Sequence, residues 1–519
     1  MSSKFFLVLI FFAFFTRLIK LDWGDGHYFN PDENNMASAI SRLSPNSLDP
    51  KFYAYGQFPL YLAYYSFRLC SFLVNRTLPD NISFTQSIMA LRFWSAIFSI
   101  FSVLIFYFIS KRIFKKKYFS EIFSLLLIFH PGLIQFSHFG TTEAILNFVL
   151  TTNILLGLLI LKSKGLKLIN LIFISSIINS IGLASKITSI ILTGPILLSL
   201  LFIFIKRKNK LSIILLGQLL VIMTIVLYAS FSPFNTISKK DFLSTMGYET
   251  AVATGKIKVF YTNQFINTKP YLFQFTHIFP YVSGLPVFLI AIIGFLSFIK
   301  KFPKSKIKRF KWSIILLTPL VYFVYIGQLY TKWIRFMSPI FFIFPFFAAY
   351  YLSSLKSGKL KIFLVIICII PGIIFLGRYF NKDIRVIGSE WVDKNIPEKS
   401  IILSEGVNVV DFPLSTKEYK ITNFNFYHLD DDSELPSKLS DLISTADYIF
   451  VPSRRIFKNQ YGVRFPHSDK YYRQLFSGVS GFKLIKTFPK QIGILDPENA
   501  EETWTVFDRP VIRIFQKIK

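Results

Sequence analysis

Two adjacent carboxylates, Asp32 and Glu33, stand out in a chain with a formal net charge of +30. They lie in the stretch 28–37 (Tyr-Phe-Asn-Pro-Asp-Glu-Asn-Asn-Met-Ala), which follows a long apolar run. Adjacent acids on a helix point in different directions, so one can act as a general base while the other orients it or pairs with a cation. The structural alternative is a helix start, because Pro31 and acids are favoured in a first helical turn.

A second group of candidates lies in 135–144 (Gln-Phe-Ser-His-Phe-Gly-Thr-Thr-Glu-Ala). Ionisable residues at membrane depth are costly and tend to be functional. Glu143 is a candidate second carboxylate facing the same cavity as Asp32, and His138 could bind a phosphate or an acceptor, although a lone histidine is more often structural. Asp32, Glu33, His138 and Glu143 together could also supply oxygen and nitrogen ligands to a divalent cation. No ligand spacing supports such a site, so we expect no cofactor.

Cations at the ends of apolar runs form a third group. Lys332 and Arg335 are three residues apart, so we expect them on one helix face, and Lys186 lies at another run's end. A phosphate at the bilayer surface would suit them, and arginine can bind it bidentately. Arg17 and Lys20 are possible partners for the acid pair. The alternative to a functional role for these five lysines and arginines is that their long side chains simply extend to the lipid headgroups.

An acid pair beside a cation cluster at a lipid surface suits glycosyl transfer from a lipid-linked phospho-sugar. The leaving phosphate ester is a weak base, so it needs charge stabilisation by Lys or Arg more than a general acid. The acceptor hydroxyl needs a base, for which Asp32 is sufficient, and direct displacement inverts the anomeric centre. An inverting hydrolase would instead need two carboxyls at a defined spacing.

Membrane helices must position these residues. The chain of 519 residues is 52% hydrophobic with a mean hydropathy of +0.47, and its apolar residues form long runs. A spanning helix needs about 20 mostly apolar residues, and its backbone must be satisfied internally. We expect eleven spans, at 4–21, 92–110, 119–137, 142–161, 168–184, 187–205, 211–230, 281–299, 312–329, 333–353 and 360–377.

The charges of the connections predict the topology. Every second connection is basic and lacks Asp and Glu; these are 111–117, 162–167, 206–210, 300–311 and 356–361. The positive-inside rule makes them cytoplasmic, so the N-terminus is expected inside and the C-terminal segment outside. We expect an integral protein of a bacterial or archaeal plasma membrane. We interpret the net positive charge as a means of contact with anionic lipid headgroups and expect no binding to nucleic acid.

The chain is expected to form two domains: a membrane domain, 1–378, and an external α/β domain, 379–519. The membrane domain carries outer loops at 22–91 and 231–280, and the aromatic-rich stretch 57–74 is read as an interfacial helix. In the tail, expected helices at 389–395 and 433–445 alternate with expected strands at 400–403, 448–451, 482–487 and 511–515. Its role is either a rigid cap or recognition of the acceptor.

On these residues the chain resembles the GT-C membrane glycosyltransferases, most closely the family 39 type that includes protein O-mannosyltransferases and aminoarabinose transferases. The matching pieces, in order, are Arg17, Pro31-Asp32-Glu33, the motif 57–60 (Gln-Phe-Pro-Leu), Arg92, Glu143, Lys186, the run 335–345 and the tail opening 390–397. Two departures are that members often have Asp at the position of Glu143, and that the tail does not resemble the sugar-binding domain of some protein mannosyltransferases.

The resemblance implies a polyprenyl-phosphate sugar donor, a hydroxyl acceptor on a glycan, lipid or protein, and chemistry on the non-cytoplasmic face. It implies Asp32 as the base and Glu33 as its support. The donor phosphate is assigned to Lys332, Arg335 and Lys186, and further substrate contacts to Arg17, Gln57 and His138. The rival functions are a transporter or lipid flippase, which would want ionisable groups near mid-membrane, and a non-catalytic assembly subunit.

Overall fold

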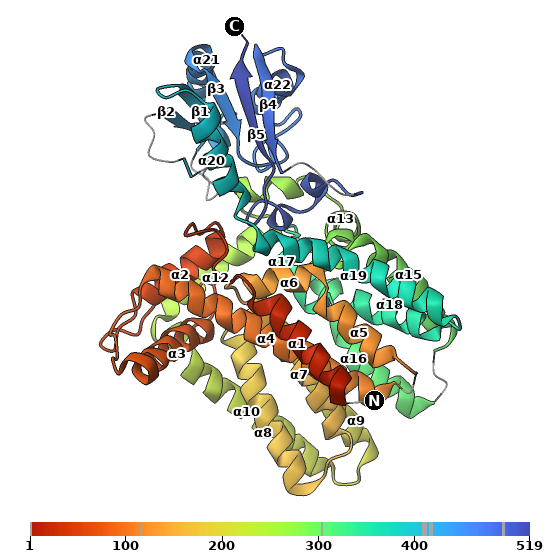
Figure 1. The fold of residues 1–519 in the computed structure, drawn as a ribbon. Helices are drawn as coiled ribbons and strands as arrows, with labels where there is room; N and C mark the ends of the chain where they lie inside the picture. Colours follow the sequence, from red (N-terminus) through yellow and green to blue (C-terminus); the bar gives the residue numbers. More distant parts are fainter. Residues whose placement is uncertain are drawn as a thin grey trace.

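The computed structural model describes residues 3–114, 116–302, 305–406, 413–414, 419–489 and 494–518. Three residues of the predicted basic connections, Lys115, Pro303 and Lys304, lie outside the described residues, as do 407–412, 415–418 and 490–493 of the predicted tail domain. The chain forms a large helical body with a smaller α/β unit mounted on one end (Figure 1).

The helical body contains α-helices and three short 3-10 helices. They are α1 (Ser3–Leu18), α2 (Pro31–Ser41), α3 (Phe58–Asn75), α4 (Phe84–Ile113), α5 (Phe119–Ile128), α6 (Pro131–His138), α7 (Glu143–Ile160), α8 (Gly165–Leu183), η1 (Ile187–Thr193), α9 (Gly194–Lys206), α10 (Lys210–Phe231), α11 (Phe234–Ile237), α12 (Lys239–Thr254), η2 (Phe260–Phe265), α13 (Leu272–His277), α14 (Phe279–Ser283), α15 (Leu285–Lys300), α16 (Lys306–Gly327), α17 (Ile334–Met337), η3 (Ser338–Ile340), α18 (Ile343–Ser354) and α19 (Gly358–Phe380).

Within the described residues, seven helical segments are long and apolar enough to cross a membrane: α4, α7, α8, η1 with α9, α10, α16 and α19. Three bent pairs pass the same test: α5–α6 at 49°, the α13/α14 segment with α15 at 115°, and the α17/η3 segment with α18 at 44°. With the shorter apolar helix α1, these occupy the eleven predicted positions, so the prediction of a polytopic helical protein is confirmed. The helix α3 is not among the segments that pass.

Small residues allow the helices to bend and to approach closely. Gly284 has φ +75°, which favours glycine, and it stands at the sharp bend before α15. Gly294 of α15 faces α18 so closely that a Cβ there would come within 2.0 Å of the Phe347 carbonyl oxygen. Such contacts hold helices together where lipid supplies no hydrophobic driving force.

The α/β unit is built on a mixed five-stranded sheet of order β2-β1-β3-β5-β4. Its elements are α20 (Ile384–Asn395), β1 (Ile401–Glu405), β2 (Lys420–Phe424), η4 (Phe426–His428), α21 (Leu435–Thr445), β3 (Tyr448–Val451), α22 (Pro466–Ser477), β4 (Phe482–Phe488), η5 (Pro497–Asn499), η6 (Glu502–Trp504) and β5 (Ile512–Lys517). β1 pairs in parallel with β2 and β3, whereas β5 pairs antiparallel with β3 and β4.

Alternate residues of the central strands face opposite sides of this sheet. Ile402 and Phe450 pack with α20 on one face, while Leu403 and Ile449 pack on the other in a cluster with residues of α21 and α22. The predicted α/β fold of the tail is confirmed. The strand β2 was not predicted, because its sequence, Lys-Ile-Thr-Asn-Phe, is mostly exposed at the sheet edge and lacks an apolar pattern.

The last part of the chain returns to the helical body before it forms β5. Ala500, Trp504, Val506 and Phe507 belong to the same buried cluster as the membrane helices, and the Trp504 ring lies 4.7 Å from that of Phe375 in α19. The tail is therefore anchored in the body by its own core residues.

Candidate functional site

The acid pair lies in the first turn of α2, at the end of the body that carries the α/β unit (Figure 1). The Asn30 side chain caps this helix and accepts the backbone N–H groups of Asp32 and Glu33 at 3.0 and 3.3 Å. Pro31 occupies the start of the helix, as its fixed φ favours. The predicted helix start is therefore present, and it separates two neighbouring carboxylates that have different surroundings.

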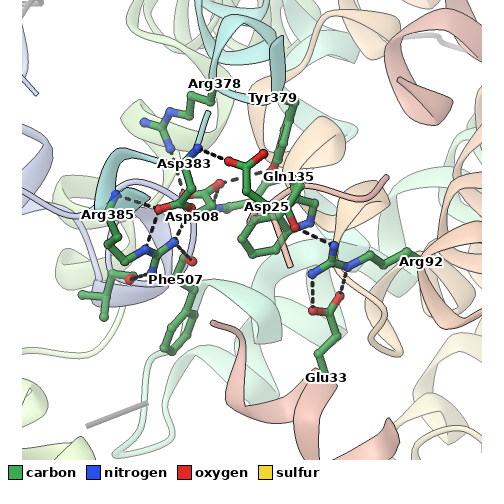
Figure 2. A network of polar contacts seen from close by, with 12 residues as sticks. Asp25, Glu33, Arg92, Gln135, Arg378, Tyr379, Asp383, Arg385, Phe507 and Asp508 are labelled. Atoms are coloured by element: carbon green, nitrogen blue, oxygen red, sulfur yellow. Dashed lines mark hydrogen bonds and ion pairs between the residues drawn. The ribbon is translucent and has the colours of Figure 1, made fainter. Parts of the chain in front are cut away.

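Glu33 is fully buried and holds Arg92 of α4 through two hydrogen bonds of 2.8 Å each (Figure 2). Its Oε1 also accepts the Gly140 backbone N–H at 2.6 Å. The Arg92 guanidinium lies 4.3 Å from the Trp23 ring centroid and donates to two backbone carbonyls. Glu33 is thus committed to fastening α2 to α4 and to the turn before α7.

Asp32 is partly open to solvent and forms an ion pair with Arg335 of α17; their side chains are 22% and 20% exposed. Arg335 also donates to the Tyr55 hydroxyl at 3.3 Å, and its guanidinium carbon lies 4.6 Å from the Trp333 ring centroid. The Arg335 Nε–H is buried and has no hydrogen-bond partner among the described residues. The guanidinium therefore keeps an unused donor beside an accessible carboxylate.

A second ion pair lies beside the first. Lys186 Nζ is 3.5 Å from Oε1 of the buried Glu143, and it lies 5.5 Å from the Tyr55 ring centroid and 4.9 Å from that of Phe336. The structure thus joins four predicted site residues, Asp32, Glu143, Lys186 and Arg335, into one constellation around Tyr55.

Tyr55 is a site residue that sequence reasoning missed. Burial, and then the carboxylates of Glu143 and Glu249, raise the pKa of Tyr55 well above its ordinary value. Its hydroxyl therefore stays protonated and neutral at physiological pH. Tyr55 is one of 25 tyrosines, and no local motif in the sequence distinguishes it.

Glu501 of the tail is a second missed residue. Its carboxylate accepts the backbone N–H of Ile334, the first residue of α17, at 3.1 Å and the Gln264 amide at 3.0 Å. It also acts electrostatically on the neighbouring Arg335 guanidinium. An acid at a helix N-terminus satisfies an unpaired donor and complements the helix dipole. The tail thus helps to place the arginine of the site.

The prediction that Lys332 and Arg335 share a helix face is wrong. Helix α17 begins at Ile334, and Lys332 lies in the extended segment before it. The Lys332 ammonium donates to the Tyr330 carbonyl at 2.8 Å and lies 5.9 Å from the Phe265 ring centroid. Burial lowers the pKa of Lys332 to about 8.

Three residues that were predicted to contact the substrate form hydrogen bonds to other parts of the protein. Arg17 donates to the carbonyls of Leu127 and Ile128 at the end of α5. Both ring nitrogens of His138 lie within 2.9 Å of backbone carbonyls, and the ring stacks on Tyr379 with centroids 3.8 Å apart. Gln57 bonds the Asn235 side chain and the Phe234 backbone N–H. These contacts identify structural roles, whereas contact with a substrate stays a prediction.

The four ligands considered for a divalent cation have other partners. Asp32 and Glu33 pair with different arginines, Glu143 pairs with Lys186, and His138 faces backbone carbonyls. Across the part of the chain that the structure describes, no group of three or more His, Cys, Asp or Glu side chains is arranged to hold a metal.

Comparisons with known proteins relate this architecture to membrane enzymes. No protein-family model matches the chain, and no curated protein matches its sequence. Among solved structures, the archaeal oligosaccharyltransferase AglB of Archaeoglobus fulgidus, in complex with an inhibitory peptide and a dolichol-phosphate, has a TM-score of 0.53 at 12% identity, covering 100% of this chain and 89% of that one. The apo oligosaccharyltransferase of the same organism has a TM-score of 0.52 at 14% identity, covering 90% and 72%. ArnT of Cupriavidus metallidurans, bound to undecaprenyl phosphate, has a TM-score of 0.45 at 12% identity, covering 98% and 97%.

The chain therefore has the fold of the GT-C class, and the resemblance noted from its motifs is confirmed at the level of fold. It is an integral membrane protein with a small α/β unit attached. Likeness at these identities establishes the fold alone, so activity has to be argued from the site.

Proposed function

We propose that this protein transfers a sugar from a polyprenyl-phosphate-linked donor to a hydroxyl acceptor, with inversion, on the non-cytoplasmic face of the membrane. The observation that carries the proposal is the pairing of Asp32 with Arg335. An accessible carboxylate able to serve as a base lies beside an arginine able to hold a phosphate. The presence of dolichol-phosphate in the AglB structure supports a lipid-phosphate donor for a chain of this fold.

Arg335 would be the principal group for the donor phosphate. Its unpartnered Nε–H and its guanidinium charge suit a phosphate oxygen. Lys186 lies beside it and Lys332 precedes it in the chain, so both can add positive charge as the leaving phosphate develops its own negative charge.

The ion pair also determines the order of donor binding and proton transfer. While Arg335 holds Asp32, the carboxylate is not free to accept a proton. An arriving donor phosphate competes for the guanidinium and releases Asp32. The acceptor O–H then gives its proton to Asp32 while its oxygen bonds to the anomeric carbon. The bond from that carbon to the phosphate oxygen breaks, and its electron pair leaves with the polyprenyl phosphate.

Glu33 would act through position rather than contact. Its buried pair with Arg92 fixes the first turn of α2 and hence the Asp32 carboxylate. Groups held by packing and by a second layer of hydrogen bonds keep catalytic geometry to fractions of an ångström. Glu143, which is buried against Lys186, would hold that ammonium in place.

The test reconstitutes the full chain in liposomes with a panel of radiolabelled polyprenyl-phosphate sugars and measures release of polyprenyl phosphate. Asp32→Asn should lower the rate about 10²- to 10⁴-fold, the usual contribution of a general base. Asp80→Asn, at an exposed outer-loop acid, is the matched control. Undiminished release by Asp32→Asn would remove the proposed base. Transport of intact donor without bond cleavage would favour the flippase.

A further inference from the structure

A cavity of about 110 Å³ lies where three separate segments meet, and neither Asp32 nor Arg335 lines it. Its walls come from the turn after α1, from the connection between α19 and α20, and from the chain end before β5. Its lining includes Arg378, Tyr379, Lys382, Asp383, Asp508 and Arg509. Figure 2 shows part of this junction, with Arg378 and Asp508 in contact.

The carboxylates of this cavity are already neutralised. Asp508 accepts from Arg378, Tyr379 and Gln135, each at 3.2 Å. Asp383 is held by the Arg385 guanidinium through two bonds, of 2.7 and 2.6 Å (Figure 2). Each carboxylate is therefore paired with an arginine, although both still act electrostatically on Arg509.

One cation of the cavity, the Arg509 guanidinium, lacks a direct hydrogen-bond or ion-pair partner among the described residues. Arg509 is half-buried, and its guanidinium makes no hydrogen bond or ion pair with any residue that the structure describes. Burial, and then the nearby positive charge of Arg378, lower the pKa of Arg509, whereas the carboxylates of Asp508 and Asp383 oppose this shift. A bound anion would act in the same direction as these carboxylates and favour the charged guanidinium. Lys382 adds a second flexible cation at the exposed rim, where it pairs with Glu390 and also lies in the field of the Asp25 carboxylate. Asn381 lies beside it.

The cavity also lies at the end of a membrane span. Arg378 and Tyr379 occupy the last turn of α19, and the Trp23 ring lies against Tyr379 with centroids 6.3 Å apart. Aromatic residues with polar tips are enriched at membrane–water boundaries, and basic pockets at this level bind lipid head groups. The volume greatly exceeds that of one water molecule.

We propose that this cavity is a second, non-catalytic site that binds a phosphate group through Arg509 and Lys382. Lipid headgroups and free phosphate share this chemistry. Because the walls come from the body and from the chain end, a bound phosphate would tie the α/β unit to the membrane helices. The proposal does not rest on the proposed transfer reaction, since neither Arg509 nor Lys382 belongs to the Asp32–Arg335 constellation.

The test measures binding to the purified full chain in a non-ionic detergent, in an Arg335→Gln background that weakens the proposed donor site. The probes are inorganic phosphate and dihexanoyl phosphatidylglycerol, read by thermal stabilisation against matched chloride. Arg509→Gln should weaken binding at least about tenfold, because it removes charge-assisted hydrogen bonds. Arg473→Gln, an exposed arginine of α22, is the matched control and should leave the affinity unchanged.

The outcomes separate the sources of the phosphate. Tighter binding of phosphatidylglycerol, displaced by inorganic phosphate, identifies a headgroup site, whereas binding of inorganic phosphate alone identifies a free anion. If Arg509→Gln fails to fold, the exposed Lys382→Gln should still weaken binding about two- to fivefold, as loss of one surface charge does. No saturable stabilisation beyond chloride, or equal affinities in these variants and Arg473→Gln, would overturn the proposal.

Discussion

The Glu501 carboxylate accepts the backbone N–H of Ile334 at 3.1 Å, across 167 residues of chain. This bond joins the tail to the first turn of the helix that carries Arg335. The Glu501 backbone N–H in turn donates to the His277 carbonyl at 3.0 Å, and the Gln264 side chain bonds both Glu501 and Glu502. The α/β unit therefore contributes to the geometry of the proposed active site.

Glu501 should make stability depend on pH near neutrality. Burial, and then the neighbouring Glu502, raise the pKa of Glu501 from 4.5 to about 7, although backbone donors and Arg454 oppose the shift. A carboxyl with a raised folded pKa binds more protons in the native state, so its contribution to stability falls as pH rises from about 4.5 to 7. As the pH rises through this window, the free energy of unfolding of Glu501→Gln should increase relative to that of the wild type by up to about 3 kcal/mol.

The measurement is the unfolding midpoint in detergent at pH 5 and pH 8. The nearby Arg335 charge favours ionised Glu501, so it would reduce the size of the stability gain. The decisive result is therefore the sign of the change: Glu501→Gln should gain more stability over the wild type at pH 8 than at pH 5. Glu398→Gln, at an exposed tail carboxylate, is the control and should show no pH-dependent difference. An equal response of both variants would contradict the assigned shift.

Arg335 should control the affinity for the donor. Replacing it by Gln removes a charge-assisted hydrogen bond to phosphate, so the donor KM should rise about 10- to 100-fold. Arg335→Lys keeps the charge but loses the planar fork, so it should give an intermediate KM. The donor dependence of polyprenyl phosphate release measures this. Arg76→Gln, at the exposed C-terminal end of α3, serves as control. A KM for Arg335→Gln equal to that of the control would refute the assignment.

The buried Glu33–Arg92 pair should dominate the stability of the α2 region. Glu33→Gln leaves the Arg92 charge buried without its counter-ion, and such losses cost about 3–5 kcal/mol. The double variant Glu33→Gln/Arg92→Met removes the unpaired charge and should recover part of this loss. Thermal unfolding measures both. The exposed Glu390 of the pair with Lys382 is the control, and Glu390→Gln should not change the midpoint.

Tyr55 should orient Arg335 through its hydroxyl. Tyr55→Phe removes the 3.3 Å hydrogen bond while keeping the ring against Lys186, so transfer should fall about 2- to 10-fold. Single-turnover rates at saturating donor measure this loss. Tyr65→Phe, on the exposed side of α3, should behave as the wild type. If the two variants have equal rates, Tyr55 has no role in orienting Arg335.

The local pattern of the sequence was enough for the helical architecture. Eleven apolar runs matched the helical segments, because a membrane helix must be apolar along its own length and satisfy its own backbone. The start of α2 was also readable, since Pro31 and the acids that follow are local helix signals. The strand β2 was not, because edge strands need no continuous apolar pattern.

Local sequence patterns did not predict how the residues of the site pair with one another. Asp32 and Arg335 could be proposed from residue type and sidedness, yet nothing in the chain states that residues 303 positions apart form a pair. The helix face expected for Lys332 and Arg335 was wrong because α17 starts later, where Glu501 satisfies its first N–H. Tyr55 and Glu501 carry no motif, so only their contacts reveal them.

The sequence alone thus determined a polytopic helical protein with a small α/β tail and an acid pair at a helix start, since these depend on hydropathy and on neighbours along the chain. Tertiary structure alone decided that Glu33 fastens α2 while Asp32 remains open, and that the tail reaches the helix of Arg335. Burial and pairing arise between distant segments, so neighbouring carboxyl groups become a buried structural anchor or a partly exposed ion pair according to which arginine each one meets.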